Sequence, residues 1–195
     1  PYFAKERYAK MVSDVLSPLK IHSTDPALDA MFNFFVPYQM LFSRIYARCG
    51  FYQVSGAYGF RDQLQDAMAA VYLRQNLAKS IILRAASHQF WEGDVQHWWH
   101  NLKAPHGYGH MGIRSRCSDD FLWLPYAVAH YISKTGDLNI LDMQIPYIES
   151  AVLSKRESER YERPRISNER ESLYMHCVRA IEHALCSFGE HGLPL

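Results

Sequence analysis

The stretch from Ser118 to Gly136, SDDFLWLPYAVAHYISKTG, carries the signals that decide the fold class. Its acidic start places negative charge at the positive end of a helix dipole, and Trp123, Ala127 and Tyr131 recur at helical spacing. A basic residue and then glycine close the stretch, which is typical of a helix end because glycine adopts the left-handed conformation at little cost. The stretch therefore predicts a helix that ends just before its final glycine.

Apolar residues recur at helical spacing along most of the chain, while the alternating patterns typical of strands are few and short. A helix is expected from Pro26, capped by Thr24 or Asp25, to Arg48 with a kink at Pro37. Further helices are expected from near Phe60, from about Asn76 to Phe90, and from about Ser167 to Phe188. The fold class is therefore predicted to be all-α. Short connections between paired helices favour a hairpin array or toroid over a four-helix bundle.

Two segments lack a helical period. Residues 91–117 concentrate glycine, histidine and tryptophan, and we expect them to form a long ordered loop. Residues 155–170 are dense in arginine and glutamate, which indicates a solvated connection. No change of composition marks a domain boundary, so residues 1–195 are expected to form one domain with a leading helix and linker at 1–23.

Composition sets limits on the function. The chain has 195 residues, 48% of them hydrophobic, which suits one globular domain, and its 14% aromatic content suits a planar-faced ligand such as a carbohydrate. Lysine and arginine number 21 against 20 acidic residues, so the charge predicts neither nucleic acid nor an anionic membrane as partner. The first ten residues lack a signal-peptide core, and a cytoplasmic location is expected. The cysteines lack CxxC spacing and are predicted to be reduced and mostly buried: Cys49, Cys117, Cys177 and Cys186.

The stretch from Gly56 to Asp66, GAYGFRDQLQD, leads from glycines into a helix with a charged first turn. Asp62 and Asp66 are four residues apart on one helix face, where two carboxylates repel each other. An external donor, a cation or a sugar hydroxyl would offset that repulsion. The structural alternative is that the acidic charge favours the helix dipole and Arg61 forms a local ion pair. The spacing leaves both interpretations open.

Residues 90–100, FWEGDVQHWWH, put flat aromatic faces beside carboxylate, amide and imidazole groups. A pyranose ring has CH-rich faces that stack on aromatic rings and hydroxyls that need both donors and acceptors. The pattern therefore favours a sugar site, and the alternative is a loop fastened by its own tryptophans.

A zinc site is a further alternative for this part of the chain. The candidate ligands are His97, His100, His106, His110 and Cys117. Neither CxxC nor HExxH spacing anchors them, and a zinc site leaves the tryptophans unexplained, so we expect no bound metal.

Residues 112–120, GIRSRCSDD, place two arginines before the acidic helix start. Arg114 or Arg116 is expected either to neutralise Asp119 or Asp120 or to orient a substrate. The sequence has no GxSxG elbow, Walker loop or dinucleotide fingerprint, which argues against an esterase, an NTPase or a Rossmann enzyme.

Four stretches together resemble one family: GFRDxxQD at 59–66, EGDVQHWW at 92–99, SDDFLWLPY at 118–126 and EHGLPL at 190–195. The chain resembles glycoside hydrolase family 94, the cellobiose and chitobiose phosphorylases, over nearly its whole length from about Thr24. The order of these motifs and the residues within them are most similar to the branch acting on β-1,2-glucans. This branch comprises 1,2-β-oligoglucan phosphorylases and the C-terminal region of cyclic β-1,2-glucan synthases.

The resemblance implies an (α/α)6 barrel and an inverting phosphorolysis that converts a β-glucoside and inorganic phosphate into α-glucose 1-phosphate. Inverting hydrolysis needs an acid and a base that activates water, whereas phosphate is already a nucleophile. One carboxylic acid and a cationic cradle for phosphate therefore suffice. No cofactor is expected, and phosphate is a co-substrate.

The resemblance also assigns roles to residues. Arg61 and Asp62 match the family's donor-sugar ligands, with Gln65 and Asp66 in support. Further substrate-binding residues are expected at Gln96, His97, Trp98, Asp119 and Asp120. Arg48 is the best match for a phosphate-binding arginine, and Arg44 is the alternative.

The family's general acid is expected beyond Leu195, so no catalytic residue is assigned here and the chain is expected to be an inactive fragment, the N-terminal portion of an (α/α)6 domain. An incomplete barrel exposes apolar helix faces, which predicts self-association and allows for a homo-oligomer. The expected partners are a β-glucan oligosaccharide and phosphate. Two alternatives remain: a chain-length-processing region of a cyclic β-1,2-glucan synthase, and a non-catalytic carbohydrate-binding protein.

Overall fold

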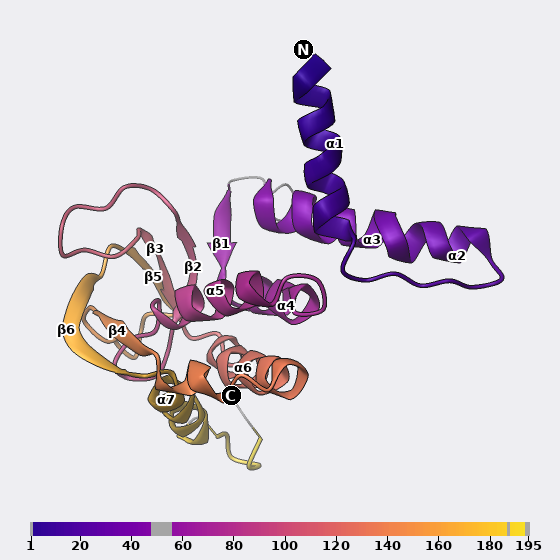
Figure 1. Cartoon of the computed structure of the whole chain (residues 1–195). Coiled ribbons are helices and arrows are strands. Elements are labelled where there is room, and N and C mark those ends of the chain that lie inside the picture. The colour runs from indigo at the N-terminus through magenta and orange to yellow at the C-terminus, as the bar shows by residue number, and fades with distance from the viewer. Residues whose placement is uncertain (1, 48–55, 187, 194–195) are drawn as a thin grey trace.

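The computed structural model describes residues 2–47, 56–186 and 188–193 of the chain. Helices and strands gather on different sides of the body in Figure 1, and the N-terminal helices project away from it. None of the helices in these described ranges is both long and apolar enough to cross a bilayer.

The main core is built by the helices α4 (Phe60–Ala70), α5 (Gln75–Ala86), α6 (Trp123–Thr135) and α7 (Leu173–Leu185). Leu64 and Leu124 are fully buried in the apolar cluster that these helices share. The helix predicted from Ser118 is confirmed in outline, because a single 3-10 turn, η3 (Asp120–Leu122), leads into α6. Gly136 ends α6 with a φ of 71°, as its position predicts. Closure of these helices into a ring stays a prediction.

The N-terminal helices form a separate apolar cluster. They are α1 (Tyr2–Leu16) and a continuous helical run made of α2 (Pro26–Ala30), η1 (Met31–Phe35), α3 (Val36–Tyr38) and η2 (Gln39–Tyr46). Asp25 caps this run by accepting the Ala27 N–H, with proline at the first position as predicted. Around Pro37 the run has wide π-type turns on both sides, because proline has no N–H to donate to a regular ladder.

Two small antiparallel sheets correct the all-α prediction. One has the order β1 (Ala57–Gly59), β2 (Gln96–His100), β3 (Gly112–Ser115) and β5 (Glu159–Glu162); the other pairs β4 (Gln144–Glu149) with β6 (Arg165–Ser172). The predicted loop at 91–117 therefore contains two strands, and the predicted connection at 155–170 contains β5 and the start of β6. A 3-10 turn, η4 (Leu138–Asp142), precedes β4.

The sequence pattern does not predict these strands, because their residues do not alternate cleanly between apolar and polar. In β2 the buried positions are Gln96 and Trp99, and β6 is mostly polar. Backbone pairing with partners distant in sequence holds them, as between Ile113 and Tyr161. Pairing of β6 with β4 moves the start of the last helix from about Ser167 to Leu173, where the Ser172 hydroxyl caps it.

Candidate functional site

The first turn of α4 places Arg61 beside the loop that precedes η3. Its guanidinium donates to Asp119 Oδ2 at 2.9 Å, between residues 58 positions apart in sequence. The Asp119 carboxylate also accepts the Trp123 indole N–H at 3.2 Å and the Cys117 thiol at 3.3 Å. Burial opposes ionisation of Asp119, but these donors outweigh burial and keep its pKa below the usual value. Asp119 is therefore a charged carboxylate that three side chains orient.

Beside this ion pair, β2 presents His97 to Asp120, the first residue of η3. His97 Nδ1 donates to Asp120 Oδ2 at 2.5 Å, and the Asp120 side chain is only 3% exposed. This hydrogen bond is the main reason that the pKa of His97 is raised, against the opposing effect of burial. The other oxygen, Oδ1, is buried and has no hydrogen-bond partner among the residues that the structure describes. Asp120 thus orients His97 and keeps one acceptor for another donor.

Asp62 belongs to the same electrostatic neighbourhood. Its charge raises the pKa of His97, while the charge of Arg61 lowers it. A Cβ atom at position 59 would lie 2.1 Å from Asp62 Oδ2, so Gly59 provides the space that this carboxylate occupies. The structure therefore brings together Arg61, Asp62, His97, Asp119 and Asp120, which we call the carboxylate cluster.

The two remaining polar residues predicted on α4 have other surroundings. Gln65 is exposed. Asp66 accepts from Arg44 Nε at 2.6 Å, so a cation of the preceding helix offsets the repulsion predicted between Asp62 and Asp66. Arg44, the alternative phosphate ligand, is engaged in this ion pair, and the preferred phosphate ligand, Arg48, lies outside the described residues.

The other predicted residues of β2 are held within the protein. The buried Gln96 amide accepts from His88 Nδ1 at 2.7 Å and donates to the His110 carbonyl at 3.0 Å. Trp98 is half-buried, with its ring 5.7 Å from that of Tyr161. The side chain of Gln96 therefore fixes the strand, and its role as a sugar ligand stays a prediction.

The structure does not pair Arg114 or Arg116 with the acidic helix start. Arg114 is buried and binds Asp94 through two bonds of 2.7 Å, with Glu92 at 3.0 Å. Arg116 donates to backbone carbonyl groups of residues 153, 154 and 157. The expectation that either arginine neutralises Asp119 or Asp120 is therefore wrong, because the cation for Asp119 comes from α4.

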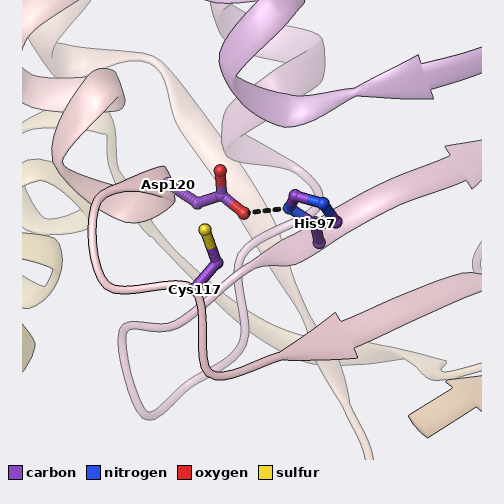
Figure 2. A group of neighbouring side chains, drawn as sticks. All are labelled: His97, Cys117 and Asp120. Carbon is purple, nitrogen blue, oxygen red and sulfur yellow. Dashed lines mark hydrogen bonds and ion pairs between the residues drawn. The ribbon is translucent and has the colours of Figure 1, made fainter. Parts of the chain in front are cut away.

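Three potential metal-ligand atoms also meet at this place. The atoms, one each from His97, Cys117 and Asp120, lie within 4.8 Å of one another, and Figure 2 shows the three side chains facing a common point. Burial raises the pKa of the Cys117 thiol to about 11, so the thiol is protonated at neutral pH and donates to Asp119. Among the zinc ligands considered from sequence, the fold keeps His97 and Cys117 together, while the ring of His110 donates to a backbone carbonyl elsewhere. Asp120 was not among those candidates.

Comparison with known proteins gives one family. Residues 12–195 match the model of the glycosyl hydrolase 94 superfamily, catalytic domain. Over 182 residues the chain is 43% identical to the cyclic beta-(1,2)-glucan synthase NdvB of Rhizobium meliloti (strain 1021), covering 93% of this chain and 6% of that protein.

Two phosphorylases are more distant relatives. The solabiose phosphorylase of Paenibacillus borealis is 29% identical over 70% of this chain and 14% of its own length. An N,N'-diacetylchitobiose phosphorylase of Vibrio furnissii is 27% identical over 66% of this chain and 19% of its own length. The chain thus spans less than a fifth of each of these relatives. The family model covers nearly all of the sequence, and the chain belongs to the glycosyl hydrolase 94 superfamily.

Proposed function

We propose that the protein containing this chain is an inverting glycoside phosphorylase that cleaves β-1,2-linked gluco-oligosaccharides with inorganic phosphate to give α-glucose 1-phosphate. This segment contributes ligands for the donor-side glucose. The observation that carries the proposal is the carboxylate cluster, in which the Arg61–Asp119 pair lies beside the His97–Asp120 pair.

The cluster offers what a glucose ring requires. Each sugar hydroxyl donates one hydrogen bond and accepts others, so its site needs cationic donors and carboxylate acceptors together. Arg61 is 45% exposed and can reach a ligand while it holds Asp119. Asp120 Oδ1 is a buried acceptor that a hydroxyl proton would satisfy. The indole of Trp123, fixed by its bond to Asp119, adds an apolar surface beside them.

Because phosphate is the nucleophile, the residues of this segment need only bind and orient the sugar. These residues bind and orient the sugar, so that the anomeric carbon meets phosphate in a fixed geometry. The proposal assigns no proton donor to the cluster, since the resemblance places the general acid after Leu195. Phosphorolysis is supported by the two relatives named as phosphorylases, and the β-1,2 linkage by the name of the glucan synthase.

The direct test uses the protein encoded by the complete gene. Sophorose-series oligosaccharides are incubated with and without phosphate, and glucose 1-phosphate is measured; cellobiose and laminaribiose serve as linkage controls. We expect product only with phosphate and mainly from the β-1,2 series. Release of free glucose that does not depend on phosphate would overturn phosphorolysis, and equal rates on all three linkages would overturn the β-1,2 assignment.

The 43% identity to a cyclic glucan synthase favours a second candidate, a region that adjusts glucan chain length within such a synthase. The test is to measure the chain-length distribution of the glucan that the complete protein makes, before and after Asp119→Asn. A changed distribution with unchanged total synthesis supports this candidate, and an unchanged distribution contradicts it.

A further inference from the structure

His97, Cys117 and Asp120 come from three consecutive structural segments that fold back on one another. His97 lies in β2, Cys117 follows β3, and Asp120 begins η3. Their ligand atoms lie within 4.8 Å of one another, and in Figure 2 the thiol points toward the carboxylate that the imidazole binds. These three side chains lie close together whether or not Arg61 contacts a sugar.

One of the two carboxylate oxygens at this point lacks a donor among the described residues. Asp120 is 3% exposed, and its Oδ1 has no hydrogen-bond partner among the described residues, although a buried unsatisfied oxygen is costly. Asp62 and Asp119 add negative charge nearby, against which the cations among the described residues are Arg61, Arg44, which also pairs with Asp66, and, when protonated, His97. A bound cation would satisfy the unpaired oxygen and reduce the surplus of negative charge.

The donor set selects the class of metal. One imidazole nitrogen, one sulfur and one carboxylate oxygen suit zinc and similar transition metals, whereas magnesium and calcium prefer oxygen alone. We propose that His97, Cys117 and Asp120 bind a divalent ion of the zinc class with three protein ligands and one position open to water or another ligand. Cys117 binds as the thiolate and His97 as the neutral imidazole, so the thiol proton and the proton of a charged His97 pass to solvent and the Cys117–Asp119 hydrogen bond is lost on binding. The 2.5 Å hydrogen bond between His97 and Asp120 opens on binding, since ligands around zinc lie roughly 3.3 Å apart when the metal–ligand distance is about 2.0–2.1 Å.

An ion can reach the site from a cavity of about 340 Å³ that Cys117 helps to line. Glu92, Asp94 and Cys186 are other wall residues, and Arg114 and Arg116 line the same cavity, so its wall carries both signs of charge. His97 and Asp120 are also the proposed sugar ligands, and bound metal therefore competes with the sugar. The metal site itself does not depend on the proposed phosphorylase activity.

The test is a titration of the chelator-treated full-length protein with Co²⁺ alone. We expect saturation and a near-ultraviolet thiolate-to-cobalt absorption band. Cys117→Ser should abolish this band and weaken binding at least 10-fold, while Cys186→Ser, a matched thiol on the same cavity wall, should retain both. A band that survives Cys117→Ser, or the absence of saturable binding to the unaltered protein, would overturn the proposal.

Three further measurements separate folding and function from metal binding. Excess Zn²⁺ should raise the unfolding temperature of the unaltered protein and of Cys186→Ser but not that of Cys117→Ser, provided that the metal-free forms melt alike. Asp120→Asn should weaken Co²⁺ binding in the same way, and undiminished binding to a folded Asp120→Asn protein would count against the site. Phosphorolysis assayed with chelator reports on the proposed function alone, so the two proposals can fail independently.

Discussion

His88 is a buried histidine that the fold keeps neutral. Its ring stacks on Trp99 with centroids 3.6 Å apart, and its Nδ1 donates to the Gln96 amide oxygen. Burial lowers the pKa of His88 from 6.5 to about 3, and the hydrogen bond to Gln96 only partly offsets this effect. The residue therefore packs the strand β2 against the helical core and has no free charge to offer a ligand.

The pKa of His88 predicts a loss of stability in acid. Between about 6.5 and about 3 the unfolded state binds a proton that the folded state does not, so the free energy of unfolding falls as the pH falls through this window. The slope from this group approaches about 1.4 kcal/mol per pH unit. Denaturant unfolding at several pH values should show a flatter dependence for His88→Gln, whatever the stability of that variant at neutral pH. An equal slope in both proteins would contradict this assignment.

Arg61 and Asp119 form a half-exposed ion pair, with side-chain exposures of 45% and 48%. Such pairs contribute about 0–1 kcal/mol, so Arg61→Lys should change the free energy of unfolding little. Lysine keeps the charge but loses the planar fork that can hold Asp119 and a sugar hydroxyl at once. On the proposed function, kcat/KM for phosphorolysis should fall by about 100-fold, because misplaced ligands at a reacting centre have costs of that size.

The matched control is Arg116→Lys, since Arg116 donates to backbone carbonyls and not to the carboxylate cluster. Its kcat/KM should stay near that of the unaltered protein. Equal losses in the two variants, or none in Arg61→Lys, would remove Arg61 from the sugar site.

At the level of elements, two glycines with positive φ connect secondary structure under different steric conditions. Gly136 ends α6 at φ 71°, and a Cβ atom there would meet nothing within 4 Å. Gly93 leads into β2 at φ 96°, and a Cβ atom there would lie 2.5 Å from the backbone oxygen of Arg179 on α7. Glycine is required at position 136 only because of its positive φ. At position 93 it is required by a positive φ and also by the close contact between the turn and α7.

This difference predicts unequal costs for the same substitution. Gly136→Ala should lower the free energy of unfolding by about 1–2 kcal/mol, the usual cost of a left-handed alanine. Gly93→Ala should cost about 1–3 kcal/mol more, because the turn must move away from α7. Denaturant unfolding of both variants measures the difference, and equal costs would show that the turn yields without strain.

For the whole molecule, the buried Arg114 joins three segments that are distant in sequence. From β3 it binds Asp94 before β2, and it donates to the backbone carbonyls of Ser150 and Ala151 after β4. Its guanidinium also lies 3.9 Å from the ring centre of Phe90. The ion pair thus fixes the strands relative to the end of α5.

Removing the charge of Asp94 should therefore destabilise the whole fold. Asp94→Asn leaves the buried guanidinium with one remaining partially exposed carboxylate, and breaking a buried pair typically costs about 3–5 kcal/mol. The control is Asp14→Asn, which breaks the exposed pair with Lys10 and should cost less than about 1 kcal/mol. Similar denaturation midpoints for the two variants would show that Arg114 does not hold the segments together.

The projecting helical run from residue 26 to 46 leaves many large apolar side chains exposed: Leu28, Met31, Phe32, Phe34, Phe35, Val36 and Tyr46. A polypeptide of these 195 residues expressed alone should self-associate, since contiguous exposed apolar surface promotes association. Sedimentation velocity should show less association for Phe32→Ser/Phe35→Ser than for the unaltered chain. A monomer at high concentration in both cases would contradict this expectation.

Local signals predict the start of α2 and the end of α6 well, whereas α5 ends four residues before the predicted Phe90 and α7 starts six residues after the predicted Ser167. The capping of Asp25 with Pro26, the acidic start before α6 and the glycine after it are contacts within one or two helical turns, and they lie where the sequence places them. The family motifs likewise mark Arg61, His97 and Asp119 as candidates, and the fold brings these three residues together. The sequence does not predict the strands, because burial alternates in β3 without an alternation of apolar and polar residues: its buried positions are Gly112 and Arg114.

The helices and the side chains available for sugar chemistry can be inferred from the order of residues, since both depend on neighbours along the chain. Which of those residues meet depends on how distant segments pack. Arg61 finds its carboxylate 58 residues away, and Cys117 turns to His97 and Asp120 only because β2 and β3 pair. An ion pair or a ligand cluster depends on distances of a few ångströms in space, which a one-dimensional pattern does not encode.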